Sequence, residues 1–157
     1  MKYYYSYQTS VGELWFCENN GYITNISYNK EFKTFDQAIR QETPTIKNAF
    51  IQVKEYLEGK RTFFDIKLAP EGTDFQKSVW EKLKEIPYGE TRTYKQIAEA
   101  TGNPKACRAV GMANNRNPIA IVLPCHRVIG ADGKLTGYAG GLSIKEQLIR
   151  LEKDNRK

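Results

Sequence analysis

The residue pattern of this 157-residue chain changes at KLAPEG, residues 67–72. The proline and glycine of this segment favour a linker, because both residues interrupt helices and strands. The chain before it contains runs rich in tyrosine and isoleucine, which are typical of strands, whereas the chain after it repeats apolar residues at helical spacing. The sequence therefore predicts an α/β protein with two domains: a small α/β domain over residues 1–70 and a mainly helical domain over residues 73–157.

The first domain is expected to hold a small sheet and one helix. Three strands are predicted at KYYYSYQ, ELWFCEN and YITNISYN, and Asn20-Gly21 between the last two predicts a hairpin. Residues 44–58 place apolar side chains on one helical face and are followed by Gly59, a typical C-terminal stop. A further short strand is predicted at TFFDI, residues 62–66.

The second domain opens with a capping box, Thr73-Asp-Phe-Gln76, which predicts the start of a helix. A second helix is predicted over residues 93–100, and Asn103-Pro104 predicts a third helix over 104–114. Later segments predict a hairpin at Asp132-Gly133 and a last helix from a Ser143–Glu146 capping box to about Lys153.

The second and third helices of this domain form a candidate helix-turn-helix, and the positive charge of the chain is concentrated there. Residues 1–103 carry 14 basic and 14 acidic side chains, so the net charge of +6 comes entirely from residues 104–157. A basic second helix is typical of DNA-binding proteins, although the same arrangement also occurs as scaffold and a basic segment can be a solvated face.

Neither the N-terminal sequence nor any apolar run predicts membrane insertion. The longest aliphatic run, IAIVL at 119–123, is too short to span a bilayer, so we expect a soluble protein of the cytoplasm with no membrane partner. Three cysteines at wide spacings form no disulfide framework, and a single histidine without a CxxC motif argues against a zinc site. We therefore expect no metal and no cofactor.

The single histidine, His126, directly follows Cys125 in LPCHRVI, residues 123–129. A thiol becomes nucleophilic when a base or a positive field favours its thiolate, and His126, Arg127 and the basic helix could supply either. The apolar approach to Cys125 also fits an inert core thiol. The residues alone leave both interpretations open, whereas Cys17 and Cys107 have no such neighbour and are expected to be structural.

From about Gly72 to Glu152 the sequence resembles the O6-alkylguanine-DNA alkyltransferases, also called methylated-DNA–protein-cysteine methyltransferases. The resemblance rests on motifs that follow one another in family order: GTDFQKSVW, IPYGET, TYKQIA, GNPKACRAVG, NPI, LPCHRVI and YAGGLSIKEQLIRLE. It implies a ribonuclease H-like N-terminal domain, although residues 1–70 match only in length and coarse pattern. It also implies a winged helix-turn-helix-like second domain, a monomer, and double-stranded DNA containing O6-alkylguanine as the partner.

The resemblance implies a catalytic role for five residues. Cys125 matches the cysteine that takes the alkyl group irreversibly, once per protein molecule, from a guanine flipped out of the duplex. His126 matches the histidine that deprotonates this thiol through water, and Glu152 matches the carboxylate that orients the histidine. Tyr94 matches a tyrosine that donates to the flipped base, and Asn117 matches an asparagine that braces the turn before the active-site loop. Without the resemblance, Glu152 reads as an exposed charge, Tyr94 as a helix aromatic and Asn117 as a loop cap.

The resemblance also implies contacts with DNA and with the base. Arg108 matches the arginine that fills the stack after base extrusion, and its alternative is a phosphate contact. Four further residues are expected at the DNA surface: Lys105, Ala106, Asn114 and Arg116. Five residues are expected to line or adjoin the guanine pocket: Val128, Tyr138, Ala139, Gly140 and Lys145.

The sequence departs from the family pattern at three places. Ala139 stands where some members have serine, although its backbone N–H could still donate to the guanine oxygen. Asn114 and Asn115 stand where others have bulkier residues, which affects groove fit, and the zinc ligands of some N-terminal domains are absent. Two other classes share parts of the pattern: a DNA-binding protein that recognises lesions without reacting, and a cysteine hydrolase or redox protein.

Overall fold

The computed structural model describes residues 1–29 and 36–156 and divides into two compact units. The first unit contains Met1–Glu71 together with Pro118–Val122, and the second contains Gly72–Asn117 and Leu123–Lys157. The division between Glu71 and Gly72 falls within the segment KLAPEG, residues 67–72. The division into residues 1–70 and 73–157 did not anticipate that residues 118–122 belong to the first unit.

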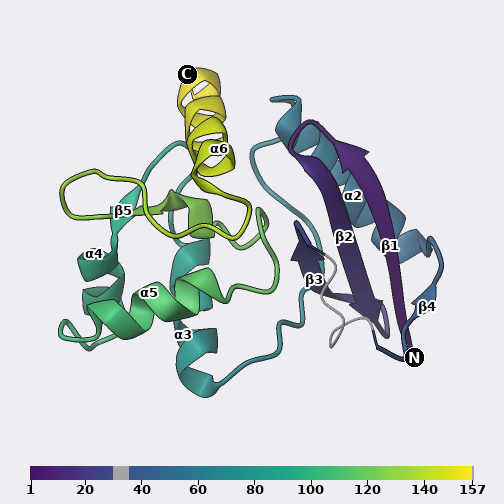
Figure 1. Ribbon diagram of the computed structural model, residues 1–157, viewed down its shortest axis with the longest axis horizontal. Helices are drawn as coiled ribbons and strands as arrows, with labels where there is room; N and C mark the ends of the chain where they lie inside the picture. Colours follow the sequence, from purple (N-terminus) through teal and green to yellow (C-terminus); the bar gives the residue numbers. More distant parts are fainter. Residues whose placement is uncertain (30–35, 157) are drawn as a thin grey trace. The chain divides into compact units, whose positions relative to one another are not determined.

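The first unit is built on a four-stranded sheet with the order β3-β2-β1-β4 (Figure 1). The strands β1 (Lys2–Thr9), β2 (Gly12–Asn19) and β3 (Tyr22–Ser27) are antiparallel neighbours, and β4 (Ile39–Arg40) runs parallel to β1. The hairpin at Asn20-Gly21 is confirmed. Both residues have positive φ, 54° and 83°, as the tightest hairpin turns require.

Helix α2 (Pro44–Leu57) covers one face of this sheet (Figure 1) and confirms the helix expected at 44–58. Its side chains Ile46 and Val53 are fully buried, and Phe50 stacks on Tyr7 of β1 with ring centroids 3.8 Å apart. Thr43 caps the helix by accepting a hydrogen bond from the backbone N–H of Ile46.

The strand expected at TFFDI, residues 62–66, is not present. The backbone N–H and carbonyl of Asp65 bond instead to the side chain of Gln52, at 2.9 and 3.0 Å, which occupies groups that a sheet ladder would need. The sheet contact forms further along the chain, where Ile23 bonds to the backbone of Lys67 and Ala69.

The second unit is mainly helical. Its elements are α3 (Asp74–Lys84), β5 (Arg92–Thr93), α4 (Tyr94–Ala100), α5 (Cys107–Asn115), the 3-10 turn η1 (Cys125–Arg127), β6 (Val128–Ile129) and α6 (Leu142–Asn155). Capping boxes begin α3 at Thr73 and α4 at Thr93, because each threonine and the glutamine three residues later exchange hydrogen bonds. The strands β5 and β6 form a short parallel pair.

Three local expectations for the second unit are wrong in detail. Helix α5 begins at Cys107 rather than 104, because Asn103 caps a separate turn by accepting from the backbone N–H of Lys105. Helix α6 begins after Gly141, whose φ of 98° sets the cap, so no Ser143–Glu146 capping box forms. Asp132-Gly133 does form a turn, but β6 pairs with β5 rather than in a hairpin.

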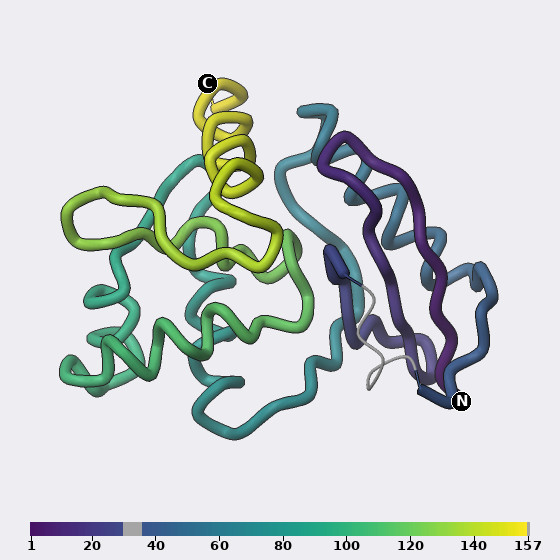
Figure 2. The backbone as a smooth tube through the Cα atoms, viewed as in Figure 1, coloured from purple at the N-terminus to yellow at the C-terminus, as the bar shows by residue number. Residues whose placement is uncertain are grey.

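Figure 2 follows the backbone from β6 through the loop of residues 130–141 into α6. This loop carries three of the five residues that the sequence assigned to the guanine pocket, whereas Val128 lies in β6 and Lys145 in α6. Among the helices of the described residues, none is long and apolar enough to cross a membrane. Within the same residues, no three His, Cys, Asp or Glu side chains gather as they would around a metal ion.

Candidate active site at Cys125

Two tight backbone turns lie directly before η1, which begins at Cys125. The N–H of Val122 bonds to the carbonyl of Ala120 at 2.8 Å, and the N–H of Cys125 bonds to the carbonyl of Leu123 at 2.7 Å. The first of these three-residue turns places Ile121 at a φ of 73°, a left-handed conformation that is strained for a β-branched residue. Such strain persists only where surrounding structure imposes it, and here it lies four residues before the cysteine.

Two asparagine side chains of the second unit bond to the backbone at the second turn and at Cys125. The Nδ2 of Asn117 donates to the carbonyl of Leu123 at 2.8 Å, so the residue lies at the turn where the sequence placed it. The Nδ2 of Asn114 donates to the carbonyl of Cys125 at 3.3 Å. Asn114 is only 2% exposed, so it supports the cysteine loop from inside rather than lying on the outer face with Lys105 as expected.

The Cys125 thiol is almost completely buried, and burial raises its pKa to about 11. A hydrogen bond from Asn117 and the charge of Lys145 act in the opposite direction and favour the thiolate. At neutral pH the thiol is therefore protonated, and a reaction at its sulfur requires a neighbouring group that takes the proton.

His126 is fully buried and is joined to Glu152 of α6, with 2.6 Å between the histidine Nε2 and the carboxylate Oε2. The carboxylate is ionised and can only accept, so Nε2 carries the hydrogen of this bond. Nδ1 is then the basic nitrogen of the ring. Burial, together with the charges of Arg127 and Lys145, lowers the pKa of His126 despite the opposing effect of Glu152. The histidine is therefore neutral and able to accept a proton.

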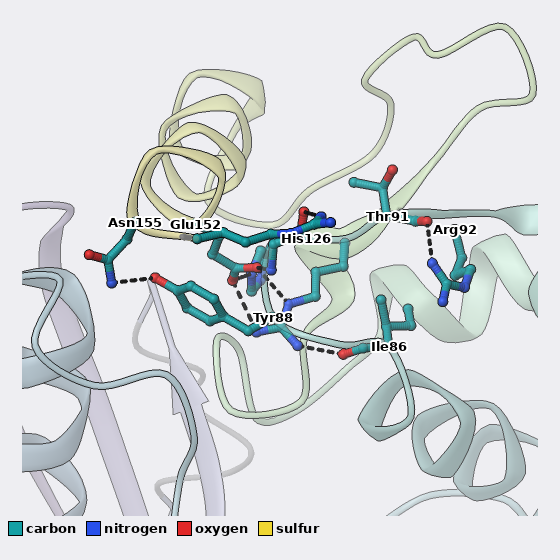
Figure 3. Close-up of polar contacts among 10 residues, drawn as sticks. Ile86, Tyr88, Thr91, Arg92, His126, Glu152 and Asn155 are labelled. Atoms are coloured by element: carbon teal, nitrogen blue, oxygen red, sulfur yellow. Dashed lines mark hydrogen bonds and ion pairs between the residues drawn. The ribbon is translucent and has the colours of Figure 1, made fainter.

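Glu152 is fixed by groups from two parts of the second unit, the turn η1 and the segment before β5 (Figure 3). Its Oε1 accepts from the backbone N–H of Gly89 at 3.0 Å and from the Nε of Arg127 at 2.8 Å. Its Oε2 accepts from Arg127 Nη2 at 3.1 Å as well as from His126. Burial alone would raise the pKa of Glu152, but these partners outweigh it and lower the pKa to about 2. At 1% exposure, Glu152 is not the exposed charge that the sequence left open.

Tyr94 and Lys145 meet at Thr136 in the 130–141 loop. The Lys145 ammonium donates to the Thr136 carbonyl at 2.7 Å and lies 6.0 Å from the centre of the Tyr94 ring. The Tyr94 hydroxyl donates to the same carbonyl at 3.2 Å. Lys145 is fully buried, and burial lowers its pKa to about 8. These contacts bring together two residues that the sequence assigned separately to the catalytic group and to the pocket.

The expected DNA-contacting residues divide between the surface and the interior. Lys105, Arg108 and Arg116 are exposed at or near α5, Ala106 is half-buried, and Asn114 is internal. Of the expected pocket residues, Val128 is fully buried, Tyr138 and Gly140 are half-buried, and Ala139 is exposed. The N–H of Gly141 bonds to the carbonyl of Tyr138 at 2.9 Å, which closes the loop just before α6.

Sequence reasoning missed the roles of Arg127, Gly89 and Thr136. Arg127 was considered only as a charge that could activate the Cys125 thiol, yet it is 7% exposed and bound to Glu152. The motif PCHRV, in which the arginine follows the histidine directly, was the available signal. Gly89 contributes through its backbone N–H, and the identity of a residue does not reveal a backbone hydrogen bond.

Two family models together match nearly the whole chain. The model described as "6-O-methylguanine DNA methyltransferase, DNA binding domain" matches residues 74–154. The model described as "6-O-methylguanine DNA methyltransferase, ribonuclease-like domain" matches residues 2–70. Both domains of the expected fold are therefore confirmed. For the first domain, the sequence alone had given only a match in length and coarse pattern.

Named relatives and solved structures agree with these matches. A methylated-DNA--protein-cysteine methyltransferase of Methanosarcina acetivorans is 54% identical over 153 residues, which cover 96% of this chain and 97% of that protein. The constitutive enzyme of that name from Bacillus subtilis is 44% identical over 159 residues, covering 98% and 96%.

The crystal structure of the Mycobacterium tuberculosis O6-methylguanine methyltransferase is 42% identical and superposes with a TM-score of 0.92, covering 100% of this chain and 96% of that one. The M. tuberculosis OGT in complex with DNA is 44% identical with a TM-score of 0.91, covering 98% and 94%. The chain belongs to the 6-O-methylguanine DNA methyltransferase family.

Proposed function

We propose that this protein repairs double-stranded DNA by transferring the alkyl group of O6-alkylguanine to its own Cys125. The cysteine sulfur attacks the alkyl carbon, a carbon–sulfur bond forms, and the bond between that carbon and the guanine oxygen breaks. The electron pair of the broken bond stays on guanine, which takes up a proton and remains in the DNA. The thioether has no good leaving group, so each protein molecule acts once.

The observation that carries this proposal is the buried Cys125, placed directly before a histidine that is held by a buried carboxylate. Because Nε2 of His126 donates to Glu152, its Nδ1 is the nitrogen that would take the thiol proton, through a water molecule as the family resemblance implies. Asn117 and the charge of Lys145 would stabilise the thiolate that results. A redox or hydrolytic cysteine could share these groups, but the exposed basic residues at α5 favour a nucleic-acid substrate.

The base would reach this cysteine by leaving the duplex, because O6 of a stacked guanine is inaccessible to a buried thiol. Arg108, exposed at the second position of α5, is proposed to fill the resulting gap. Lys105, Ala106 and Arg116 would contact the backbone, Tyr94 would donate to the base, and the segments of Val128 and Tyr138–Gly140 would line its pocket. We further propose that the protein works as a monomer in the cytoplasm and needs no cofactor.

Mass spectrometry after mixing the protein with DNA containing O6-methylguanine tests the proposal. We expect one added methyl group on the peptide containing Cys125 and none on peptides containing Cys17 or Cys107. The Cys125→Ser variant should bind the same DNA without becoming methylated, because a hydroxyl is a far weaker nucleophile. A stable but unmodified complex with the parent would indicate a lesion-binding protein, and the absence of any interaction would indicate a cysteine enzyme with another substrate.

A further inference from the structure

We propose that Arg127 is a positioning residue for the transfer reaction: its guanidinium fixes the plane of the Glu152 carboxylate so that Glu152 holds His126 with Nδ1 as the proton acceptor. This inference rests on the proposed function, because the reaction it serves is the deprotonation of Cys125. Arg127 touches neither substrate nor reacting atoms, so its effect would pass through Glu152 and His126.

The contacts of Arg127 leave its guanidinium little freedom. Nε and Nη2 donate to the two oxygens of Glu152 at 2.8 and 3.1 Å, and Nη1 donates to the carbonyl of Ile86 at 2.7 Å. The guanidinium carbon also lies 5.7 Å from the centre of the Tyr88 ring. A two-pronged pair of this kind holds carboxylate and guanidinium nearly coplanar, and lysine could not reproduce it with one nitrogen. The direction in which Oε2 meets His126 is thereby set.

The positive charge of Arg127 also affects the pKa of His126. A carboxylate beside a buried histidine favours the protonated imidazolium, which cannot act as a base. Arg127 neutralises that carboxylate and lowers the pKa of His126, and Lys145 of α6 acts in the same direction. The charged groups acting on His126 are thus Glu152 and Lys145 from α6 and Arg127 from its own turn. The titratable Cys125 precedes His126 in that turn. Of the two cations Arg127 and Lys145, only Arg127 forms an ion pair with Glu152 among the described residues.

A purely structural role for Arg127 predicts a different outcome from a positioning role. The guanidinium joins η1 to α6 and to the backbone at Ile86, so its loss could simply loosen the fold. A loosened site would lose rate equally at every pH. Loss of the charge beside Glu152 would instead raise the pKa of His126, so the rise of rate with pH should occur at higher pH.

The experiment measures the rate of Cys125 modification against pH for the full-length parent and the variants Arg127→Gln and Arg127→Lys. Two reagents are used in parallel, duplex DNA containing O6-methylguanine and iodoacetamide, with modification located by mass spectrometry. Arg150→Gln is the matched control, because Arg150 lies exposed on α6 and pairs only with Glu146 among the hydrogen bonds and ion pairs of the described residues. Urea unfolding identifies the range in which each variant is folded.

In Arg127→Gln we expect the rising limb of both pH profiles to move upward by about one pH unit, the usual effect of one nearby charge. Arg127→Lys should keep the limb near its parental position, because the charge is retained, but lower the rate about tenfold through lost alignment. Arg150→Gln should match the parent. The proposal would be overturned if the rising limb of the pH–rate profile stayed in place in both Arg127 variants while the rate fell by the same factor at all pH values. A shifted iodoacetamide profile in a protein that never accepts methyl from DNA would sustain the role of Arg127 and reject the proposed function.

Discussion

At the scale of single residues, the site depends on one carboxylate that remains charged while buried. Glu152 is 1% exposed, and its pKa of about 2 lies well below the ordinary 4.5 because His126 and Arg127 outweigh the cost of burial. A group whose pKa is lowered by folding stabilises the folded state above its ordinary pKa and loses that contribution as the pH falls toward the lowered value.

We therefore expect the parent to lose about 3 kcal/mol of unfolding free energy through Glu152 between about pH 5 and pH 2. The Glu152→Gln variant should be less stable at pH 7, because Arg127 is left buried without its counter-charge, and its stability should fall less steeply toward acid. Urea unfolding at a series of pH values measures both. Parallel stability curves for parent and variant would show that Glu152 is not the group that titrates.

The sequence revealed part of this site. Cys125 and His126 are neighbours in the chain, so their association could be read directly, whereas Glu152 was found only through the family resemblance because 26 residues separate it from His126. The burial of Arg127 could not be inferred from a segment that looks uniformly basic. Whether a charged side chain faces water or a buried partner depends on how α6 packs on η1, and a local pattern does not contain that information.

At the scale of elements, the main question concerns α5. The sequence predicted a basic helix after a glycine-containing turn, and the structure provides one, shorter by its first turn because Asn103 caps a separate turn. The capping box of α3 was predicted correctly because it depends on residues three apart. The box of α4 at Thr93 was not anticipated, and the box expected at Ser143 does not form. The strand at TFFDI was wrong because a side chain from another element, Gln52 of α2, competes for its backbone.

Replacing Arg108 on α5 tests whether this helix does more than attract phosphates. We expect Arg108→Ala to lower the repair rate in duplex DNA much more than duplex affinity, because a side chain that fills the stack offsets the few kcal/mol or so of unstacking. The deficit should shrink opposite a mismatch or abasic site and nearly vanish with free O6-alkylguanine base. Single-turnover rates on these substrates provide the measurement.

Arg116→Ala is the control for Arg108, because Arg116 is also exposed and lies just beyond the end of α5. Loss of a phosphate contact should weaken binding to all duplexes and reduce the salt dependence by about one unit of slope. If Arg108→Ala behaves in the same way, or loses an equal fraction of rate on free base, Arg108 does not assist base extrusion.

At the scale of the whole molecule, the chain passes between the two units more than once. Residues 118–122 belong to the first unit, where Ile26 of β3 bonds to Pro118 and Ala120 at 2.9 Å each and Ile119 is fully buried. The chain then returns to the second unit at Leu123, two residues before the cysteine. The bond from Asn117 to Leu123 closes this excursion at its base.

We expect Ile119→Ala to destabilise the protein by about 2–5 kcal/mol and also to slow alkyl transfer, because the altered segment leads directly into Cys125. Ile46→Ala removes the same side chain from an equally buried position in α2, so it should cost similar stability without slowing transfer in the fully folded protein. Urea unfolding and single-turnover rates compare the two. Equal rates for both variants would show that the segment contributes only to stability.

The excursion of residues 118–122 also limits how this architecture can be divided by evolution. A gene that lost the codons for residues 1–71 would still encode Cys125, His126 and Glu152. It would remove Ile26 of β3, beside which Ile119 is completely buried, and would separate the buried Ile121 from the unit to which its segment belongs. Selection on such a shortened descendant would favour polar residues at these two positions, or a shorter connection between Asn117 and Leu123. A protein that arose by such a loss could therefore be recognised from its residues at positions 118–122, between Asn117 and Leu123.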